Sequence, residues 1–294
     1  MNSYEEVKEM HEAHCFKLRA PRACVVEDVT AGEPHLMKFL QAHRHFHDKH
    51  FHVKKADGSY KQRKFMRKWL ADKTARTVDR LTVDATGCIQ NAYNLWKAPL
   101  AAISEEVEEG VVAELVQPIV QHIEEVICDG SPSRAKQVLG FLSNIIKHRR
   151  ADRALYVYGD KGCGASVIFK FFCSQVLGPY NSFQTYKPSL EMQTFHRSCV
   201  LVGGAQRVQK SLNSLITKKT VCYRQKNSRS PVEVESLVNL IITAKKPPTL
   251  KEHSFDVFQC SSKRVGQTEY FDALRAHVGR ADVARAFYQF LAAY

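Results

Sequence analysis

A glycine-rich segment near the middle of the chain has the residue types and spacing of a phosphate-binding loop. The P-loop pattern is GxxxxGK followed by Ser or Thr, and the segment GDKGCGAS fits each fixed position except the lysine, which is Ala165. Backbone N–H groups of such a loop could still surround phosphate oxygens, and the Ser166 hydroxyl could bind a magnesium ion. The ammonium group that neutralises the β- and γ-phosphates is missing, and Lys161 replaces it only if its side chain turns into the loop. The candidate nucleotide-binding residues are Gly159, Asp160, Lys161, Gly162, Cys163, Gly164, Ala165 and Ser166.

The same segment also fits a strand-to-helix turn that holds no nucleotide, and we favour this interpretation because the lysine is missing. A short apolar strand is expected at Ala154–Tyr158 before the turn, and an amphipathic helix after it. Further strands are expected at 199–202, 221–224 and 237–243, with helical stretches between them. Strands that alternate with helices favour a mainly parallel sheet flanked by helices, so the predicted fold class is α/β.

Two helices are expected in the segment that leads to this sheet. Leu115, Ile119, Ile123 and Ile127 recur near the helical period, and Gly130 is expected to end that helix. A second helical pattern follows and ends in basic residues, which suit the negative end of the helix dipole.

The N-terminal part carries weaker patterns and is expected to be smaller and mostly helical. His43 and His47, in the histidine-rich stretch 43–52, could bind a metal from one helix face. No cysteine lies nearby and Asp48 is the neighbouring carboxylate, so we favour a solvated helix and expect no metal site. Residues 61–72 predict an amphipathic helix with its basic side outward.

The charge of the chain points to a polyanionic partner. There are 43 Lys and Arg against 30 Asp and Glu, which gives a net charge of +13 and a pI near 9.3. Nucleic acid is favoured over an anionic membrane. Residues 54–80 hold ten basic and three acidic residues, and residues 207–229 hold seven basic residues and no acidic one. Solvated surfaces also carry such runs. Nucleic-acid contact is therefore favoured for residues 207–229, whereas for residues 54–80 nucleic-acid contact and a solvated surface are equally favoured.

Composition excludes several classes of protein. Hydrophobic residues make up 44% of the chain, charged residues 25% and aromatic residues 10%, which are ordinary values for a folded protein. No run of 18 apolar residues occurs, and the charged start does not resemble a signal peptide, so we expect an intracellular protein without a membrane partner. The nine cysteines are placed singly without a CxxC pair, so they are expected to be reduced and mostly buried.

Several blocks together resemble the superfamily 3 helicase domain of viral and phage primase-helicases, in the poxvirus and giant-virus type. The resemblance runs from about residue 60 to the end of the sequence. It rests on FMRKWLADKTARTVDRLTVDATGCIQNAYNLWKAPLAA, the helix pair at 111–150, GDKGCGAS, SLITKKTVCYRQKNSRSPVEVESLVNLIIT and FDVFQCSS. It implies a collar-like region in residues 1–110 and an AAA+-like P-loop domain in residues 111–294 that assembles as a ring around DNA. It also implies that a basic hairpin contacts DNA, with Lys218, Lys219, Arg224, Lys226 and Arg229 as the nucleic-acid-binding residues.

The sequence departs from the family at several positions that the resemblance assigns to ATP hydrolysis. Ala165 replaces the Walker A lysine, and Gly203 and Gly204 stand where the Walker B acidic pair is expected. Lys245 falls at the sensor asparagine, while His253 and Ser254 replace the arginines of the trans-acting finger. Because an arginine finger alone contributes roughly 10³- to 10⁵-fold in rate, we expect no catalytic residue in this chain.

The sequence therefore predicts a catalytically inactive, helicase-like protein that binds nucleic acid in the DNA replication of a virus or mobile element. Two alternatives remain open: an active ATP-dependent DNA helicase with atypical motifs, and a structural or scaffold protein that reuses the fold. No cofactor is expected beyond weak binding of ATP and magnesium. The expected partners are single-stranded DNA and either further copies of the chain in a homo-oligomer or an active helicase subunit. The expected location is intracellular, at a viral replication site.

Overall fold

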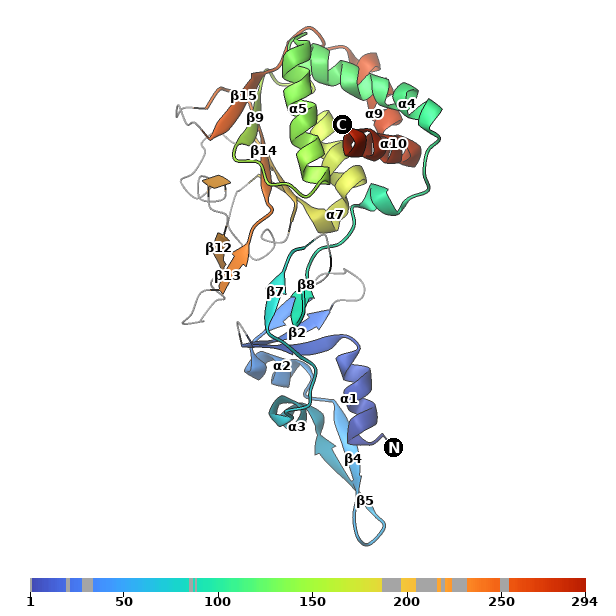
Figure 1. Cartoon of the computed structure of the whole chain (residues 1–294), viewed down its shortest axis with the longest axis vertical. Coiled ribbons are helices and arrows are strands. Elements are labelled where there is room, and N and C mark those ends of the chain that lie inside the picture. The colour runs from blue at the N-terminus through green and yellow to red at the C-terminus, as the bar shows by residue number, and fades with distance from the viewer. Residues whose placement is uncertain are drawn as a thin grey trace. The chain divides into compact units, whose positions relative to one another are not determined.

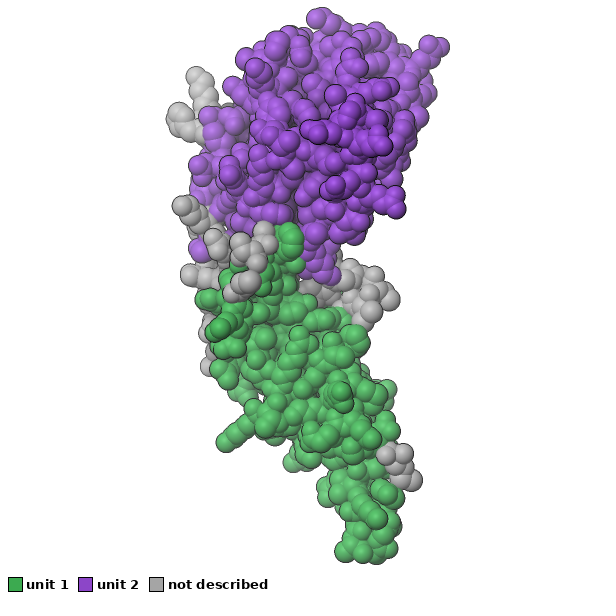
Figure 2. Space-filling view, turned by 45° about the vertical axis from the view of Figure 1, so that its right-hand side comes forward, with its two compact units in different colours: residues 1–96, 224–232 green, residues 97–223, 233–294 purple. Residues whose placement is uncertain are grey.

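The computed structural model describes residues 2–19, 22–27, 34–84, 87, 89–186, 197–204, 216–217, 220–223, 232–248 and 254–294. The chain forms two compact units (Figure 2), residues 1–96 with 224–232 and residues 97–223 with 233–294. We call them unit 1 and unit 2. The functional division into a collar-like region and a helicase-like domain at residue 110 stays a prediction, and the compact units divide earlier, between residues 96 and 97.

Unit 2 is built on a five-stranded sheet in which all neighbouring strands are parallel. The strand order is β10-β11-β14-β9-β15, and Figure 1 shows helices α5, α4 and α10 beside this sheet. Near-continuous apolar runs such as ALYVY and NLIITA are typical of parallel strands that are covered on both faces. The predicted parallel α/β sheet is confirmed, except that the strand expected at 221–224 belongs to a separate two-stranded sheet. Its strands are β9 (Ala154–Tyr158), β10 (Ser182–Thr185), β11 (Cys199–Gly203), β14 (Asn239–Ala244) and β15 (Phe255–Gln259).

Alternate residues of the strands enter two different cores. Leu155 and Val157 of β9 belong to the large cluster that the helices complete, whereas Ala154 and Tyr156 belong to a smaller cluster. This alternation follows from the two-residue period of a strand. The helices of unit 2 are η1 (Leu100–Ile103), α4 (Glu109–His122), η2 (Ile123–Ile127), α5 (Pro132–Ile146), α6 (Val167–Phe171), η3 (Phe172–Leu177), α7 (Gly178–Asn181), α9 (Thr268–Val278) and α10 (Ala281–Ala293).

The helix predicted around Leu115 is confirmed, with a change of type along its length. Leu115, Ile119, Ile123 and Ile127 are all buried, as the period predicts. The α-helical part ends at His122, and a π-helical turn continues it through Ile127. Gly130, just beyond, has a φ of +80°, which suits the chain reversal that glycine permits.

Unit 1 is not mostly helical, so this part of the fold prediction is wrong. Its described part contains eight short strands and three helices. Runs such as CFKL and ACVVE are only four and five residues long, and periodicity cannot tell a strand from a buried helix at that length. The strands are β1 (Cys15–Leu18), β2 (Ala23–Glu27), β3 (Pro34–Met37), β4 (His50–Lys54), β5 (Tyr60–Lys64), β6 (Thr77–Val78), β7 (Arg80–Thr82) and β8 (Ala92–Asn94), and the helices are α1 (Tyr4–Glu12), α2 (Phe39–His45) and α3 (Phe65–Ala71).

Two local expectations in unit 1 also need correction. The single helix expected over residues 61–72 is a strand up to Lys64 followed by α3, because Tyr60–Lys64 pairs with His50–Lys54 in an antiparallel hairpin. The helix expected in the histidine-rich stretch ends at His45, and the last two histidines lie on β4.

Candidate functional site

The glycine-rich loop lies at the carboxyl end of β9, between that strand and α6. In parallel α/β sheets, ligands bind outside the carboxyl ends of the strands. The Gly159 N–H donates a hydrogen bond to the Ala244 carbonyl at the end of β14, at 3.2 Å. Gly162 and Gly164 have φ values of +90° and +93°, a region that residues with a Cβ resist. The path of this loop therefore depends on glycine.

His122 of α4 holds the last glycine of the loop in place. Its Nε2 lies 3.3 Å from the Gly164 carbonyl oxygen, and its Nδ1 lies 2.9 Å from the Tyr270 hydroxyl. A carbonyl only accepts, so Nε2 donates and the hydroxyl donates to Nδ1. Burial lowers the pKa of His122, which agrees with a neutral ring. Sequence reasoning missed this residue, because a histidine on the apolar side of a helix carries no separate signal.

Two cysteine side chains pack against the first glycine. A Cβ at Gly159 would lie 2.8 Å from the Cys260 Cβ and 3.1 Å from the Cys163 Sγ. Both cysteines are buried free thiols that share a hydrogen bond, which lowers the pKa of Cys163 to about 6 and, together with burial, raises the pKa of Cys260. The seven cysteines that the structure describes as free are all buried, as predicted for reduced thiols.

A cavity of about 290 Å³ opens at the loop. Besides the loop residues, its walls include Thr243, Lys245 and Arg275. Three cations therefore line it, Lys161, Lys245 and Arg275, which is the charge expected of a pocket for a phosphate-sized anion. Among the described residues that line it, Asp160 is the only carboxylate, and its Oδ2 accepts a hydrogen bond from the Ser262 hydroxyl at 2.8 Å.

The two glycines at the Walker B position lie beside an aromatic ring. Gly203 ends β11, and Gly204 follows it with a φ of +65°. A Cβ at Gly203 would lie 3.0 Å from the Cε1 atom of Tyr186. The end of β11 therefore offers no carboxylate, and the space for a side chain at Gly203 is occupied by the ring of Tyr186.

The remaining expected positions are not all at the cavity. Lys245 follows β14 and lines it, whereas Ser254 precedes β15 at the amino end of the sheet. His253 lies outside the described residues, as do the five cations of the expected hairpin, Lys218, Lys219, Arg224, Lys226 and Arg229. The strands on either side of residues 224–231, β12 (Thr220–Tyr223) and β13 (Val232–Glu235), pair in a two-stranded sheet. This pairing agrees with a hairpin, and the role of its cations stays a prediction.

The described part of the molecule contains neither a metal-binding cluster nor a membrane-spanning helix. Among those residues, no group of three or more His, Cys, Asp and Glu side chains could hold a metal ion. No helix in the same part is both long and apolar enough to cross a membrane.

The architecture is similar to that of solved structures. Apo structures of the C-terminal region of NrS-1 superpose with TM-scores of 0.61, 0.65 and 0.62 at 13%, 13% and 14% identity. These alignments cover 95%, 100% and 95% of this chain, and 65%, 69% and 65% of the NrS-1 region. No protein-family model and no curated protein matches the sequence. The chain therefore shares its fold with about two thirds of the NrS-1 C-terminal region.

Proposed function

We propose that this chain is a catalytically inactive, helicase-like protein that binds nucleic acid during replication of a virus or mobile element. The observation that carries the proposal is a loop with P-loop spacing and glycine geometry whose cavity lacks the groups that transfer a phosphoryl group. Its lysine position is Ala165, and its acidic positions are Gly203 and Gly204. The fold shared with the NrS-1 C-terminal region supports the helicase-like part of the proposal.

The absence of a working catalytic set follows from what phosphoryl transfer needs. The reaction depends on positioned charges: a cation on the transferred phosphate, carboxylates for magnesium, and a group that orients the attacking water. Asp160, the one carboxylate among the described residues of the cavity wall, already accepts a hydrogen bond from Ser262. A Cβ at Gly203 would lie 3.0 Å from Tyr186 Cε1, so a side chain there would require this exposed ring to shift. The residues present therefore suit the binding of a phosphate group better than its transfer to water.

Nucleotide binding without hydrolysis is the second candidate function. Lys161, Lys245 and Arg275 line the cavity, and their charges favour a phosphate group. Ser166 is the N-cap residue of α6 and carries the hydroxyl that could bind magnesium. We therefore propose weak ATP binding as a remnant property, with nucleic acid, single-stranded DNA before duplex, as the functional ligand. Assembly into a homo-oligomer or with an active helicase subunit belongs to the same proposal.

The test is phosphate release by the purified chain with ATP and magnesium, with and without single-stranded DNA. We expect background release in both conditions. The matched control is an Asp160→Ala and Ser166→Ala double variant, because a contaminating ATPase would be unaffected by it. DNA-stimulated release that this variant abolishes would overturn the proposal in favour of an active enzyme. We also expect that Ala165→Lys alone does not restore turnover, because the carboxylates remain missing.

A further inference from the structure

The β4–β5 hairpin of unit 1 carries exposed cations on a defined face. In the antiparallel register, Phe51 lies opposite Arg63 and Val53 lies opposite Lys61. Residues directly opposite each other in a strand pair point to the same side. These four side chains therefore share one face of the hairpin, which we call the groove face. The opposite face carries His50, His52, Lys54, Tyr60, Gln62 and Lys64.

A groove of about 790 Å³ lies along the groove face. Phe51 and Val53 line it with apolar atoms, and Val53 is 43% exposed. Five cations also line it, Lys61, Arg63 and Lys64 of β5 and Arg67 and Lys68 of α3. The Lys68 ammonium lies over the rings of Tyr4 and Phe51. Lys61, Arg63 and Arg67 are exposed. The result is an apolar strip bordered by positive charge.

The three cations have no acidic partner that would neutralise them. Among the described residues, no carboxylate forms an ion pair with Lys61, Arg63 or Arg67. The carboxylate in the hairpin turn, Asp57, instead accepts hydrogen bonds from the backbone N–H and hydroxyl of Ser59, at 2.8 and 2.6 Å. The charge of the groove is therefore available to a polyanion.

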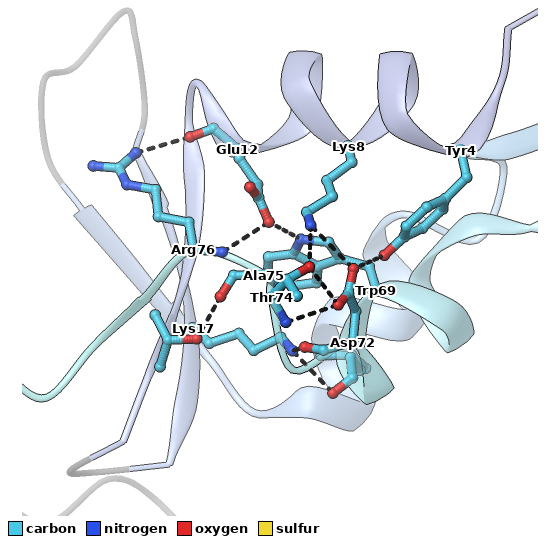
Figure 3. A network of polar contacts seen from close by, with 11 residues as sticks. Tyr4, Lys8, Glu12, Lys17, Trp69, Asp72, Thr74, Ala75 and Arg76 are labelled. Atoms are coloured by element: carbon cyan, nitrogen blue, oxygen red, sulfur yellow. Dashed lines mark hydrogen bonds and ion pairs between the residues drawn. The ribbon is translucent and has the colours of Figure 1, made fainter.

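The helix that supplies Arg67 is held firmly (Figure 3). Trp69 of α3 is fully buried, and its Nε1 donates a hydrogen bond to Glu12 Oε1 at 2.7 Å. The Lys17 ammonium donates to the carbonyls of Leu70 and Asp72 at the end of the helix, at 3.1 and 2.6 Å. A cation on a fixed helix needs little ordering of the backbone when a ligand binds.

We propose that the groove face, with Lys61, Arg63 and Arg67, binds the phosphate backbone of a single-stranded nucleic acid. The inference rests on the proposed function and names contact residues other than Lys218, Lys219, Arg224, Lys226 and Arg229. Guanidinium groups pair with phosphate oxygens through two parallel hydrogen bonds. The apolar strip suits an unpaired base or sugar, which a duplex keeps inside its stack. No side chain on this face is placed to distinguish bases by their edges, so binding has little sequence preference.

The experiment measures binding of a labelled oligo(dT) to the full chain by fluorescence anisotropy over a range of salt concentrations. The variant is Lys61→Ala, Arg63→Ala and Arg67→Ala together. Each phosphate contact in a single strand contributes about 0.7 to the slope of log affinity against log salt, so we expect the slope to fall by about 2. Affinity at low salt should fall about tenfold or more.

The matched control removes three exposed cations of unit 1 that do not line the groove, through Lys54→Ala, Lys55→Ala and Lys73→Ala. We expect it to change the slope by less than half as much. An equal loss in both triple variants would overturn the inference, because general charge would then explain the effect.

A second readout on the parent chain is acetylation of lysines with and without oligo(dT), in which Lys61 should be protected and Lys54 should not. Thermal melts of both variants establish that they fold.

The outcomes separate this inference from the proposed function. If the parent binds oligo(dT) and the groove variant binds as tightly at every salt concentration, only the groove inference fails, and Lys218, Lys219, Arg224, Lys226 and Arg229 become the contact residues. If the parent binds no oligonucleotide at low salt, the nucleic-acid part of the proposed function fails together with the inference. Binding to duplex as tightly as to single strands would contradict the assigned role of the apolar strip. Binding to vesicles of anionic lipid instead of oligonucleotides would assign the groove to a membrane surface.

Discussion

At the loop, each outer glycine has a structural reason that does not involve a nucleotide. Gly159 lies against Cys260, and Gly164 lies against Phe271 and His122. Substituting either glycine would push a Cβ into a buried side chain. The glycine spacing of the loop therefore has a packing role that does not depend on the catalytic groups. The loop can keep this spacing without them, because buried side chains pack directly against its outer glycines.

A pair of glycine variants tests this explanation. A Cβ at Gly164 would lie 2.5 Å from Phe271 Cε1, so Gly164→Ala should lower the free energy of unfolding by about 2 to 4 kcal/mol. Gly162 also has a positive φ but has open space around it, so Gly162→Ala should cost only about 1 to 2 kcal/mol. Urea unfolding of both variants is the measurement. Equal losses would show that the packing around Gly164 relaxes freely.

His11 of α1 should make stability depend on pH. It is buried among the rings of Phe46, Phe65 and Trp69, and the Lys49 ammonium lies 3.2 Å from its Nδ1. Burial, with a smaller contribution from Lys49, lowers the pKa of His11 to about 3. The unfolded ring binds a proton below about pH 6.5 and the folded ring does not. The stability that His11 contributes is therefore complete above pH 6.5 and is lost as the pH falls from 6.5 towards 3.

At pH 5 this loss should be about 2 kcal/mol relative to pH 7. The measurement is urea unfolding of the parent and of His11→Gln at both pH values. Because glutamine does not titrate, the variant should lose about 2 kcal/mol less between the two pH values. The same loss in both proteins would mean that His11 accepts a proton in the folded chain.

At the scale of elements, Asp72 joins α1 to the turn after α3. Its Oδ2 accepts a hydrogen bond from the Tyr4 hydroxyl at 2.6 Å and lies 3.1 Å from the Lys8 ammonium, and its Oδ1 accepts from the Thr74 N–H and hydroxyl (Figure 3). The hydrogen bond from Tyr4 contributes most to lowering the pKa of Asp72. The carboxylate therefore stays ionised and stabilises this junction in mildly acidic solution.

Asp72→Ala should lower the stability of unit 1 by about 2 to 3 kcal/mol, because it leaves the Tyr4 hydroxyl and the Thr74 N–H without their acceptor. Asp79→Ala is the matched control. Asp79 pairs with Arg19 at 2.8 Å, but the two side chains are 46% and 71% exposed. Its loss should cost less than about 1 kcal/mol. A similar cost for both changes, by thermal melting, would contradict the role given to the network.

The sequence predicts unit 2 better than unit 1, for a physical reason. The helix around Leu115 is long, apolar and periodic, and the strand at Ala154–Tyr158 is an apolar run followed directly by a glycine-rich turn, so local pattern and tertiary packing agree. In unit 1, the short strands form because they pair with segments that are distant in the sequence. Lys17 of β1 pairs with Thr77 of β6, a contact that no local window contains.

The candidate site also has one part that the sequence predicts and another that it does not. The glycine loop was predictable because the residues that form it are contiguous. Its contacts with His122, Tyr270 and Cys260 join distant segments, and nothing in their local sequence marks them. The groove face could not be predicted from the sequence, because the register of β4 with β5 decides which cations of the basic run lie on the same face.

At the scale of the whole molecule, each buried cluster among the described residues draws its members from one unit. One cluster, which includes Phe65 and Trp69, lies in unit 1, and the two clusters around the parallel sheet lie in unit 2. A chain with separate cores need not unfold in one step. We therefore expect two transitions in thermal or urea unfolding. Asp72→Ala should shift one of them and Gly164→Ala the other, and a shift of both by either variant would show that the units unfold together.

The positions of the two tryptophans allow the two unfolding transitions to be distinguished by fluorescence. The chain has only two, Trp69 and Trp96, and both belong to unit 1. Trp69 is fully buried in unit 1 and Trp96 lies at its boundary, so intrinsic emission excited at the red edge of the indole band reports mainly on unit 1. Far-ultraviolet circular dichroism also records the larger helical content of unit 2. A single sample contains its own unit-specific probe, and no label has to be attached to learn which half of the protein a ligand stabilises.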